Sequence, residues 1–178
     1  RGQSLDQKPA PYIAIPTTAG TGAEVTRNAV LDSTEHRVKV SMRSPMMLPR
    51  MAVVDPLLTV GLPPHITAAT GMDALTQLIE AYVSKRANPI VDALARDGIA
   101  TSAQALKRSY IDGRDRVARE KMALAALLGG LSLANAGLGA VHGIAGPLGG
   151  MVAVPHGSAC GKLLPLVMRA NIRNLESQ

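Results

Sequence analysis

Residues 66–83 read ITAATGMDALTQLIEAYV, and this stretch indicates the kind of fold that the chain adopts. Its apolar residues recur at intervals of three and four and do not alternate, which is the spacing of the buried face of an α-helix. Asp73 and Gln77 are four residues apart, so both project from one face of that helix. The spacing therefore predicts a long helix that carries two polar side chains in apolar surroundings.

The chain changes character between residues 55 and 63. Beyond this point four more stretches have helical spacing and are separated by Gly, Pro or Asn, namely residues 89–110, 114–135, 139–148 and 157–173. Before it, short apolar runs around a polar turn predict a strand at 12–15, a hairpin built from 24–31 and 37–42, and a returning strand at 51–54. We therefore predict an α/β part over residues 1–58 and an all-α part over residues 59–178.

Composition limits the class of protein. Hydrophobic residues make up 47% of the 178, whereas aromatic residues make up 2% with no Trp or Phe, so the core must be built from aliphatic and small side chains. Cys160 is the only cysteine, which excludes an internal disulfide and suits a reduced cytoplasm. We expect Cys160 to be a small core residue and not a nucleophile, because nothing nearby is placed to make it a thiolate.

The formal net charge of +6 raises the question of nucleic acid binding. Much of the excess lies in residues 107–121, where Asp112, Asp115 and Glu120 are interleaved with the basic side chains, as on a solvated helix face. Aromatic residues for base stacking are scarce, and no apolar run reaches the roughly 18 residues that suggest a membrane span. We expect a cytoplasmic protein that binds neither nucleic acid nor membrane.

Residues 15–26, IPTTAGTGAEVT, run from a strand into a loop rich in Gly and Thr. Glycines let a backbone approach a ligand closely, and Thr hydroxyls with free N–H groups can hold a phosphate or a ribose. The loop is neither a P-loop nor a GxGxxG fingerprint, since it lacks the lysine of the first and the glycine spacing of the second. The residues alone leave a plain turn and a nucleotide contact both open.

His142 and His156 lie fourteen residues apart in the most apolar, Gly-rich part of the chain. A single histidine there is more often a satisfied core residue, and Asp73 alone could be a helix cap or a buried acid with a partner. Two imidazoles and a carboxylate together suit Zn2+ and Fe2+ alike. Asp73, His142 and His156 therefore predict a divalent-metal site, in which Gln77 could take part.

Together these segments resemble the iron-containing (group III) alcohol dehydrogenases. The patterns of that family include a TTAGTG-type loop, a helix of the form GxDALTH, and the pair VHGxAHPLG and PHG, which this chain follows in order and spacing from about Ile13 to Leu166. The resemblance implies a dehydroquinate synthase-like two-domain fold. This chain would hold an incomplete version, with an α/β remnant of the dinucleotide-binding domain followed by the all-α helical metal-binding domain.

The resemblance also implies an activity. It is hydride transfer between the carbon of a small alcohol or aldehyde and the nicotinamide of NAD or NADP, with Fe2+, or alternatively Zn2+, polarising the oxygen. Matched by position, the metal ligands are Asp73, His142 and His156, with Gln77 at the fourth place. The residues matched to cofactor contacts are Thr17, Thr18, Thr21, Thr26, Asn28 and Lys39. We expect the assembly to be a homo-oligomer, a dimer.

The sequence departs from the family pattern at three points. Gln77 stands where the family has a histidine, and an amide oxygen is a weaker, neutral ligand. Gly146 stands where many members have a histidine near the substrate, and the GGGS-type pyrophosphate segment is absent, so we expect a fragment or a truncated chain that binds NAD(P) weakly. These departures keep open one alternative, a non-catalytic helical module that dimerises or binds metal. Among enzymes, the nearest rival is a glycerol-dehydrogenase-like polyol oxidoreductase.

Overall fold

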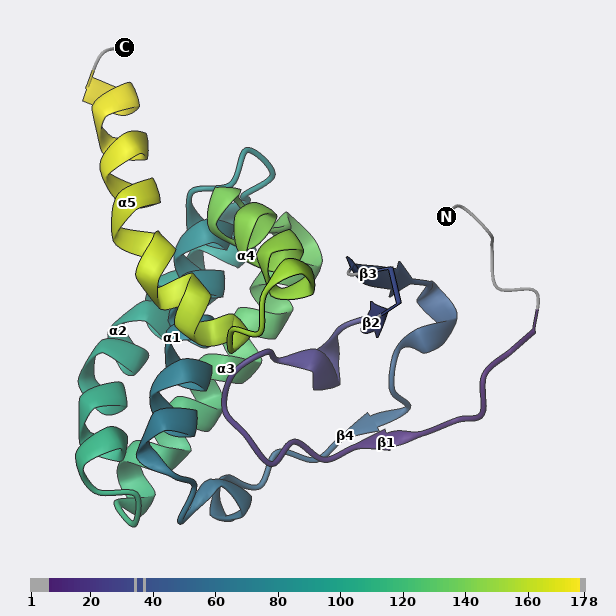
Figure 1. Ribbon diagram of the computed structural model, residues 1–178. Helices are drawn as coiled ribbons and strands as arrows, with labels where there is room; N and C mark the ends of the chain where they lie inside the picture. Colours follow the sequence, from purple (N-terminus) through teal and green to yellow (C-terminus); the bar gives the residue numbers. More distant parts are fainter. Residues whose placement is uncertain (1–6, 34, 37, 177–178) are drawn as a thin grey trace.

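The computed structural model describes residues 7–33, 35–36 and 38–176. Its strands form two small sheets to one side of the helices (Figure 1). β1 (Ile13–Ala14) pairs in parallel with β4 (Met51–Ala52), and β2 (Asn28–Ser33) pairs antiparallel with β3 (Val38–Arg43). Three short 3-10 turns lie between and after these strands: η1 (Ala23–Val25), η2 (Pro45–Met47) and η3 (Pro56–Thr59).

The five predicted helices are all present. They are α1 (Pro64–Tyr82), α2 (Pro89–Ile111), α3 (Arg116–Ala136), α4 (Ala140–Met151) and α5 (His156–Glu176). Local signals set their ends: the Asn88 side chain accepts hydrogen bonds from the first N–H groups of α2, and Asp115 does the same for α3. Gly137, with a φ of 75°, ends α3 in a conformation that favours glycine.

The helices pack through small side chains. α1 lies at the centre, where it contacts α2, α3 and α5 (Figure 1). Ala74 of α1 is fully buried against Ala105 of α2 and Ala126 of α3, so the backbones approach closely without the aromatic residues that the chain lacks. A second cluster joins α4 and α5 to α1 through Val141, Cys160 and Met72. Because other helices contact α1 on several sides, its polar face is buried as well as its apolar face.

The hairpin prediction was wrong in its first residues. The predicted strand began at residue 24, whereas β2 begins at Asn28 and η1 precedes it. Gly22 adopts a left-handed φ of 60°, and the Thr26 hydroxyl donates to the carbonyl of Ala23, which closes a tight turn. That turn packs on α3, where Gly22 meets Gly130 so closely that neither position has room for a Cβ. Tertiary packing thus overrides the strand propensity of residues 24–27.

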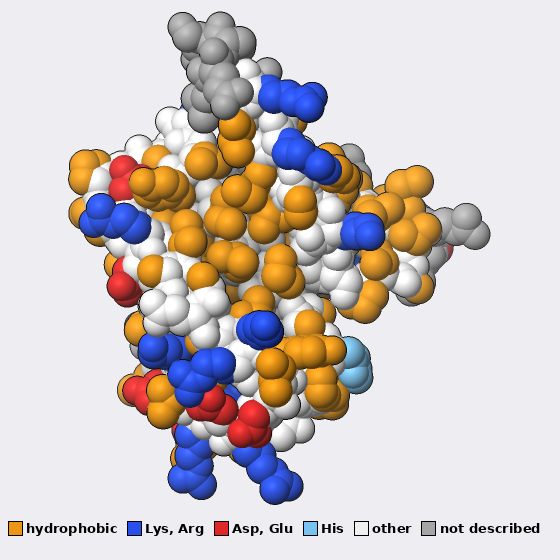
Figure 2. Space-filling view, turned by 90° about the vertical axis from the view of Figure 1, so that its left-hand side faces the viewer, with side chains coloured by type: hydrophobic (Ala, Val, Ile, Leu, Met, Phe, Trp, Pro, Cys, Tyr) orange, Lys and Arg blue, Asp and Glu red, His pale blue; other side chains and the backbone are white. Residues whose placement is uncertain are grey.

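Hydrophobic side chains also gather on the outer surface, on the side where α2 and α5 lie (Figure 2). A separate groove has lining residues from α1 and α2: Ala68, Met72, Leu75, Ser102, Ala103, Leu106, Lys107 and Tyr110. Within the part of the chain that the structure covers, α3 and α4 together meet the length and apolarity of a membrane span only as a pair bent by 101°, and no single helix meets them.

The contact between α5 and α1 predicts a glycine requirement at the start of α5. A Cβ at Gly157 would overlap the backbone carbonyl of Ala69, so Gly157→Ala should force the helices apart and lower the free energy of unfolding by about 1–3 kcal/mol. Gly143→Ala is the matched control, because a Cβ there meets nothing within 4 Å among the described residues and should instead stabilise by about 0.5–1 kcal/mol. Urea denaturation would measure both changes, and equal effects would contradict the predicted contact.

Candidate metal centre

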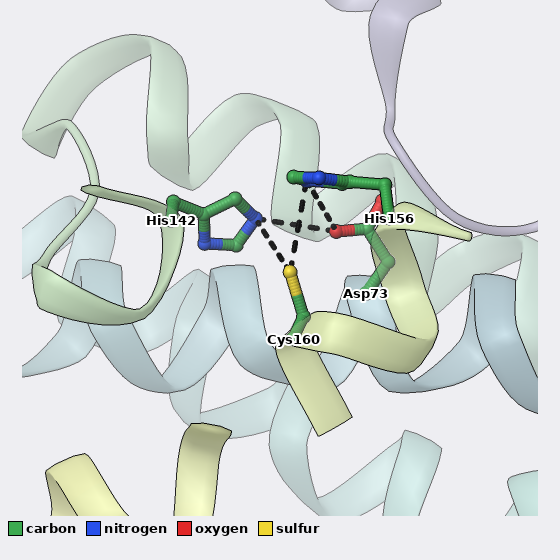
Figure 3. A group of neighbouring side chains, drawn as sticks. All are labelled: Asp73, His142, His156 and Cys160. Carbon is green, nitrogen blue, oxygen red and sulfur yellow. Dashed lines mark hydrogen bonds and ion pairs between the residues drawn. The ribbon is translucent and has the colours of Figure 1, made fainter. Parts of the chain in front are cut away.

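Four side chains from three helices converge on one point (Figure 3). They are Asp73 of α1, His142 of α4, and His156 and Cys160 of α5, and one donor atom from each lies within 4.8 Å of the other three. We call these four residues the donor cluster. The Asp73 Oδ1 atom lies 3.2 Å from His142 Nε2 and 3.7 Å from His156 Nε2. Cys160 Sγ lies 3.8 Å from His142 Nε2 and 3.6 Å from His156 Nε2.

The helices explain why these residues meet. His156 and Cys160 are four residues apart, so they share one face of α5, and His142 stands in the first turn of α4. The Asp73 side chain is 5% exposed and the His142 side chain 10%, whereas that of His156 is 38% exposed. Solvent therefore reaches the donor cluster beside His156, and a small molecule could approach from that side.

Glu80 is a buried residue beside the donor cluster that the sequence did not indicate. It is 3% exposed and accepts hydrogen bonds from the backbone N–H of Val141 and from Nδ1–H of His142, each 2.6 Å long. Burial alone would raise the pKa of Glu80, but the hydrogen bonds from His142 and from the start of α4 outweigh it and hold the pKa below the usual 4.5. A carboxylate on Nδ1 leaves Nε2 directed at the donor cluster, as in metal-ligating histidines.

The donor cluster also perturbs His142. Burial opposes its protonation, but hydrogen bonds with Asp73, Cys160 and Glu80 raise the pKa of His142 to about 11. The ring is therefore protonated when no cation is present. A metal ion would replace the proton on Nε2, since a coordinating imidazole must be free of it.

Cys160 corrects an expectation. It is a fully buried core residue, as expected, but the view that nothing near it could favour a thiolate was wrong. Burial would raise the pKa of Cys160, and the hydrogen bonds with His142 and His156 lower it instead. The four-residue spacing of His156 and Cys160 within a predicted helix was a signal that could have found this pair.

Gln77 and Gly146 stand apart from the donor cluster's contacts. Gln77 is 3% exposed, and its amide oxygen has no hydrogen-bond partner within residues 7–33, 35–36 and 38–176. This oxygen faces Gly129 of α3, 3.3 Å from where a Cβ at that glycine would lie. A Cβ at Gly146 would meet no described atom within 4 Å, so a larger side chain fits there. Coordination by Gln77 stays a prediction.

The residues predicted to contact a cofactor lie on the loop and turn around η1 and on the hairpin of β2 and β3. Thr17, Thr18 and Thr21 are exposed on the loop before η1, whereas Thr26 is buried and its hydroxyl is used within the turn. Asn28 begins β2, and the Lys39 side chain of β3 packs against Gly149 of α4. Gly20 of the loop packs on Thr70 of α1, which fixes the loop beside the helix that carries Asp73. Their contacts with a cofactor remain predictions.

Fold and donor set together define a class of protein in which a small α/β part precedes a helical metal-binding part. Two family models match the chain: "Iron-containing alcohol dehydrogenase" over residues 1–56 and "Fe-containing alcohol dehydrogenase family, C-terminal" over residues 67–178. The chain belongs to the iron-containing alcohol dehydrogenase family. The resemblance drawn from the sequence is thereby confirmed, whereas the exact boundary between the two parts stays a prediction.

Individual relatives agree. The chain is 48% identical over 170 residues to 1,3-propanediol dehydrogenase of Klebsiella pneumoniae, which is 96% of this chain and 44% of that protein. It is 46% identical over 163 residues to alcohol dehydrogenase 4 of Saccharomyces cerevisiae, which is 92% of this chain and 43% of that protein. The crystal structure of sulfoacetaldehyde reductase from Bifidobacterium kashiwanohense, in complex with NAD+, matches with a TM-score of 0.90 at 39% identity, over 96% of this chain and 45% of that one.

These matches confirm the predicted fold class, an α/β remnant followed by a helical domain. The chain spans less than half the length of the curated relatives that it matches.

The geometry around Glu80 predicts a stabilising role that depends on pH. Glu80→Gln removes the charge that holds His142 and the start of α4, so it should lower the free energy of unfolding at neutral pH by about 1.5–3 kcal/mol. Because the pKa of Glu80 is lowered, this contribution is complete above the usual value of 4.5 and is lost as the pH falls below it, through the folded-state pKa. Denaturant unfolding of both proteins across this range measures the difference.

Glu120→Gln is the control for this comparison, because Glu120 is an exposed acid of α3 and its loss should change stability by less than about 0.5 kcal/mol. A difference between wild type and Glu80→Gln that stays constant from neutral pH into strong acid would contradict the assigned role.

Proposed function

We propose that this chain forms the metal-binding part of an NAD(P)-dependent alcohol dehydrogenase or aldehyde reductase that acts on a small alcohol or aldehyde. The observation that carries the proposal is the convergence of Asp73, His142 and His156 at one point in a chain of this family. Both histidines present Nε2 toward Asp73 Oδ1, at 3.2 and 3.7 Å. A buried carboxylate and two imidazoles with such spacing suit a divalent ion.

The donor chemistry fits Fe2+ and Zn2+ alike, because both accept imidazole nitrogen and carboxylate oxygen. A divalent metal held by these residues supplies a Lewis acid that lowers the pKa of an alcohol and polarises a carbonyl. Asp73 contributes the negative charge that balances the cation, and Glu80 fixes the ring of His142 so that Nε2 stays in place. The exposed edge of His156 marks the side from which substrate would enter.

The loop before η1 is the proposed contact with the cofactor. Thr17 and Thr18 are exposed and could bind ribose or phosphate; Thr21 is exposed too, and its hydroxyl accepts a hydrogen bond from the N–H of Ala23, while Thr26 shapes the turn from inside. Asn28 and Lys39 lie on the adjoining hairpin, with Lys39 against α4. The sulfoacetaldehyde reductase relative was solved in complex with NAD+, which supports a nicotinamide cofactor for this chain.

The relatives also suggest a class of substrate. The name of the relative at 48% identity, 1,3-propanediol dehydrogenase, favours a short alcohol with more than one hydroxyl, which is also what the polyol alternative predicts. A second candidate function is a helical module that binds metal without turnover. It is suggested by Gln77 and Gly146, which stand where the family has histidines. A homodimer and a cytoplasmic location stay predictions.

Metal removal separates these candidates. Stripping the purified protein with a chelator should abolish NAD(P)H oxidation with short aldehydes, and Fe2+ or Zn2+ should restore it. Asp73→Asn should lower kcat/KM by roughly 100-fold or more, because a metal's charge stabilisation is worth several kcal/mol. Asp97→Asn, an exposed acid of α2, is the matched control and should leave kcat/KM unchanged. Stoichiometric metal without turnover would support the non-catalytic module, and full activity in metal-free protein would refute the metal-dependent enzyme.

A further inference from the structure

We propose that Cys160 supplies the fourth metal ligand of the donor cluster, in place of a side chain at position 77, and that the resulting Asp–His–His–Cys set prefers Zn2+ to Fe2+. This inference rests on the metal site of the proposed function. It adds a ligand that the sequence pattern did not indicate, and it narrows the choice of metal.

The first argument is the spacing of the donor atoms. With Zn–S near 2.3 Å and Zn–N near 2.0–2.1 Å, a tetrahedral site has a sulfur-to-nitrogen edge of about 3.5 Å and a nitrogen-to-oxygen edge of about 3.3 Å. Cys160 Sγ lies 3.6 Å from His156 Nε2 and 3.8 Å from His142 Nε2. The nitrogen-to-oxygen distances to Asp73 are 3.2 and 3.7 Å. These four edges already match a tetrahedron to within about 0.4 Å.

The second argument is the direction of the side chain. Cys160 is fully buried, and most of its surroundings are apolar, including Val141, Ala145 and Leu164. Its sulfur nevertheless points at the two imidazoles and lies within 4.8 Å of a carboxylate oxygen of Asp73 (Figure 3). A thiol that only filled space would have no reason to face three polar donors. The backbone of α5 places Sγ there, one turn beyond His156.

The third argument concerns Gln77. Its amide oxygen is buried beside Gly129 of α3, whereas the donor cluster lies among α1, α4 and α5. An amide oxygen is also a weak, neutral ligand, whereas a thiolate is a charged, soft ligand that binds a divalent ion more strongly. Direction and ligand strength therefore both favour Cys160 over Gln77.

The change of ligand changes the preferred metal. Thiolate is a soft ligand that selects Zn2+, and Zn2+ binds nitrogen and sulfur donors more tightly than Fe2+ does in the general order of stability. A site with three harder donors and a weak fourth oxygen lacks that selectivity. The donor cluster of this chain should therefore hold Zn2+ in competition with Fe2+.

Cobalt substitution tests the assignment without any assay of activity. A Co2+–thiolate bond gives an intense charge-transfer absorption in the near ultraviolet, and Cys160 is the only cysteine of the chain, so such a band can come from no other residue. We expect wild-type protein loaded with Co2+ to show the band and Cys160→Ser to lose it. Zn2+ affinity of Cys160→Ser should fall by more than the roughly 10- to 100-fold that loss of an outer partner costs. Ser158→Ala, an exposed neighbour on α5, should keep both.

Gln77→Leu separates the two candidate ligands, because it removes the amide while nearly keeping the volume. We expect its Zn2+ affinity to equal that of wild type, and a competition titration of wild type should favour Zn2+ over Fe2+. Co2+ bound without the band, or metal lost from Gln77→Leu and retained by Cys160→Ser, would overturn the role of Cys160 and leave the proposed function standing. Failure of the wild type to bind Co2+ or Zn2+ at all would overturn both. If Cys160→Ser does not fold, the presence or absence of the Co2+–thiolate band in the wild-type spectrum decides whether Cys160 is a ligand.

Discussion

The arrangement of the donor cluster depends on the hydrogen bonds that the buried carboxylate of Glu80 accepts. One side chain of α1 accepts hydrogen bonds from the first N–H groups of α4 and from the ring of His142, so it fixes the position of that helix and the orientation of its functional residue together. α4 is rich in glycine and carries Pro147, which makes it a weak helix by itself. Glu80 of α1 therefore fixes the start of α4 and the ring of His142, while the rest of α4 packs mainly on α5 and β3.

Contacts between small residues also fix the position of the N-terminal part of the chain relative to α1 and α3. Ala19 of the loop before η1 packs in one cluster with Ala74, the residue next to Asp73, and Gly22 meets the backbone of α3 at Gly130. Contacts between backbones leave little freedom, because no flexible side chain lies between them. The loop proposed to hold a cofactor is thus placed relative to the donor cluster by close packing.

The sequence predicted those parts of the structure that depend on local pattern. The five helices followed from apolar spacing and from breaks at Gly, Pro and Asn, and the pair of histidines with Asp73 stood out because polar residues are rare in apolar stretches. Glu80 was missed because a glutamate in a helix is normally exposed, and its partner His142 lies 62 residues away. The turn at η1 was missed because its conformation is set by contact with α3, which no local pattern records.

α1 also carries a restriction on its length. Asp73 and Glu80 are seven residues apart, which is close to two full turns, so one helix face presents the first carboxylate to the donor cluster and the second to the start of α4. Each residue inserted or deleted between them would rotate one carboxylate by about 100° relative to the other. Substitutions in this interval leave the spacing of the two carboxylates unchanged, but a change in length separates the two functions of the helix. The number of residues between positions 73 and 80 is therefore fixed by the two contacts that the ends of this segment make.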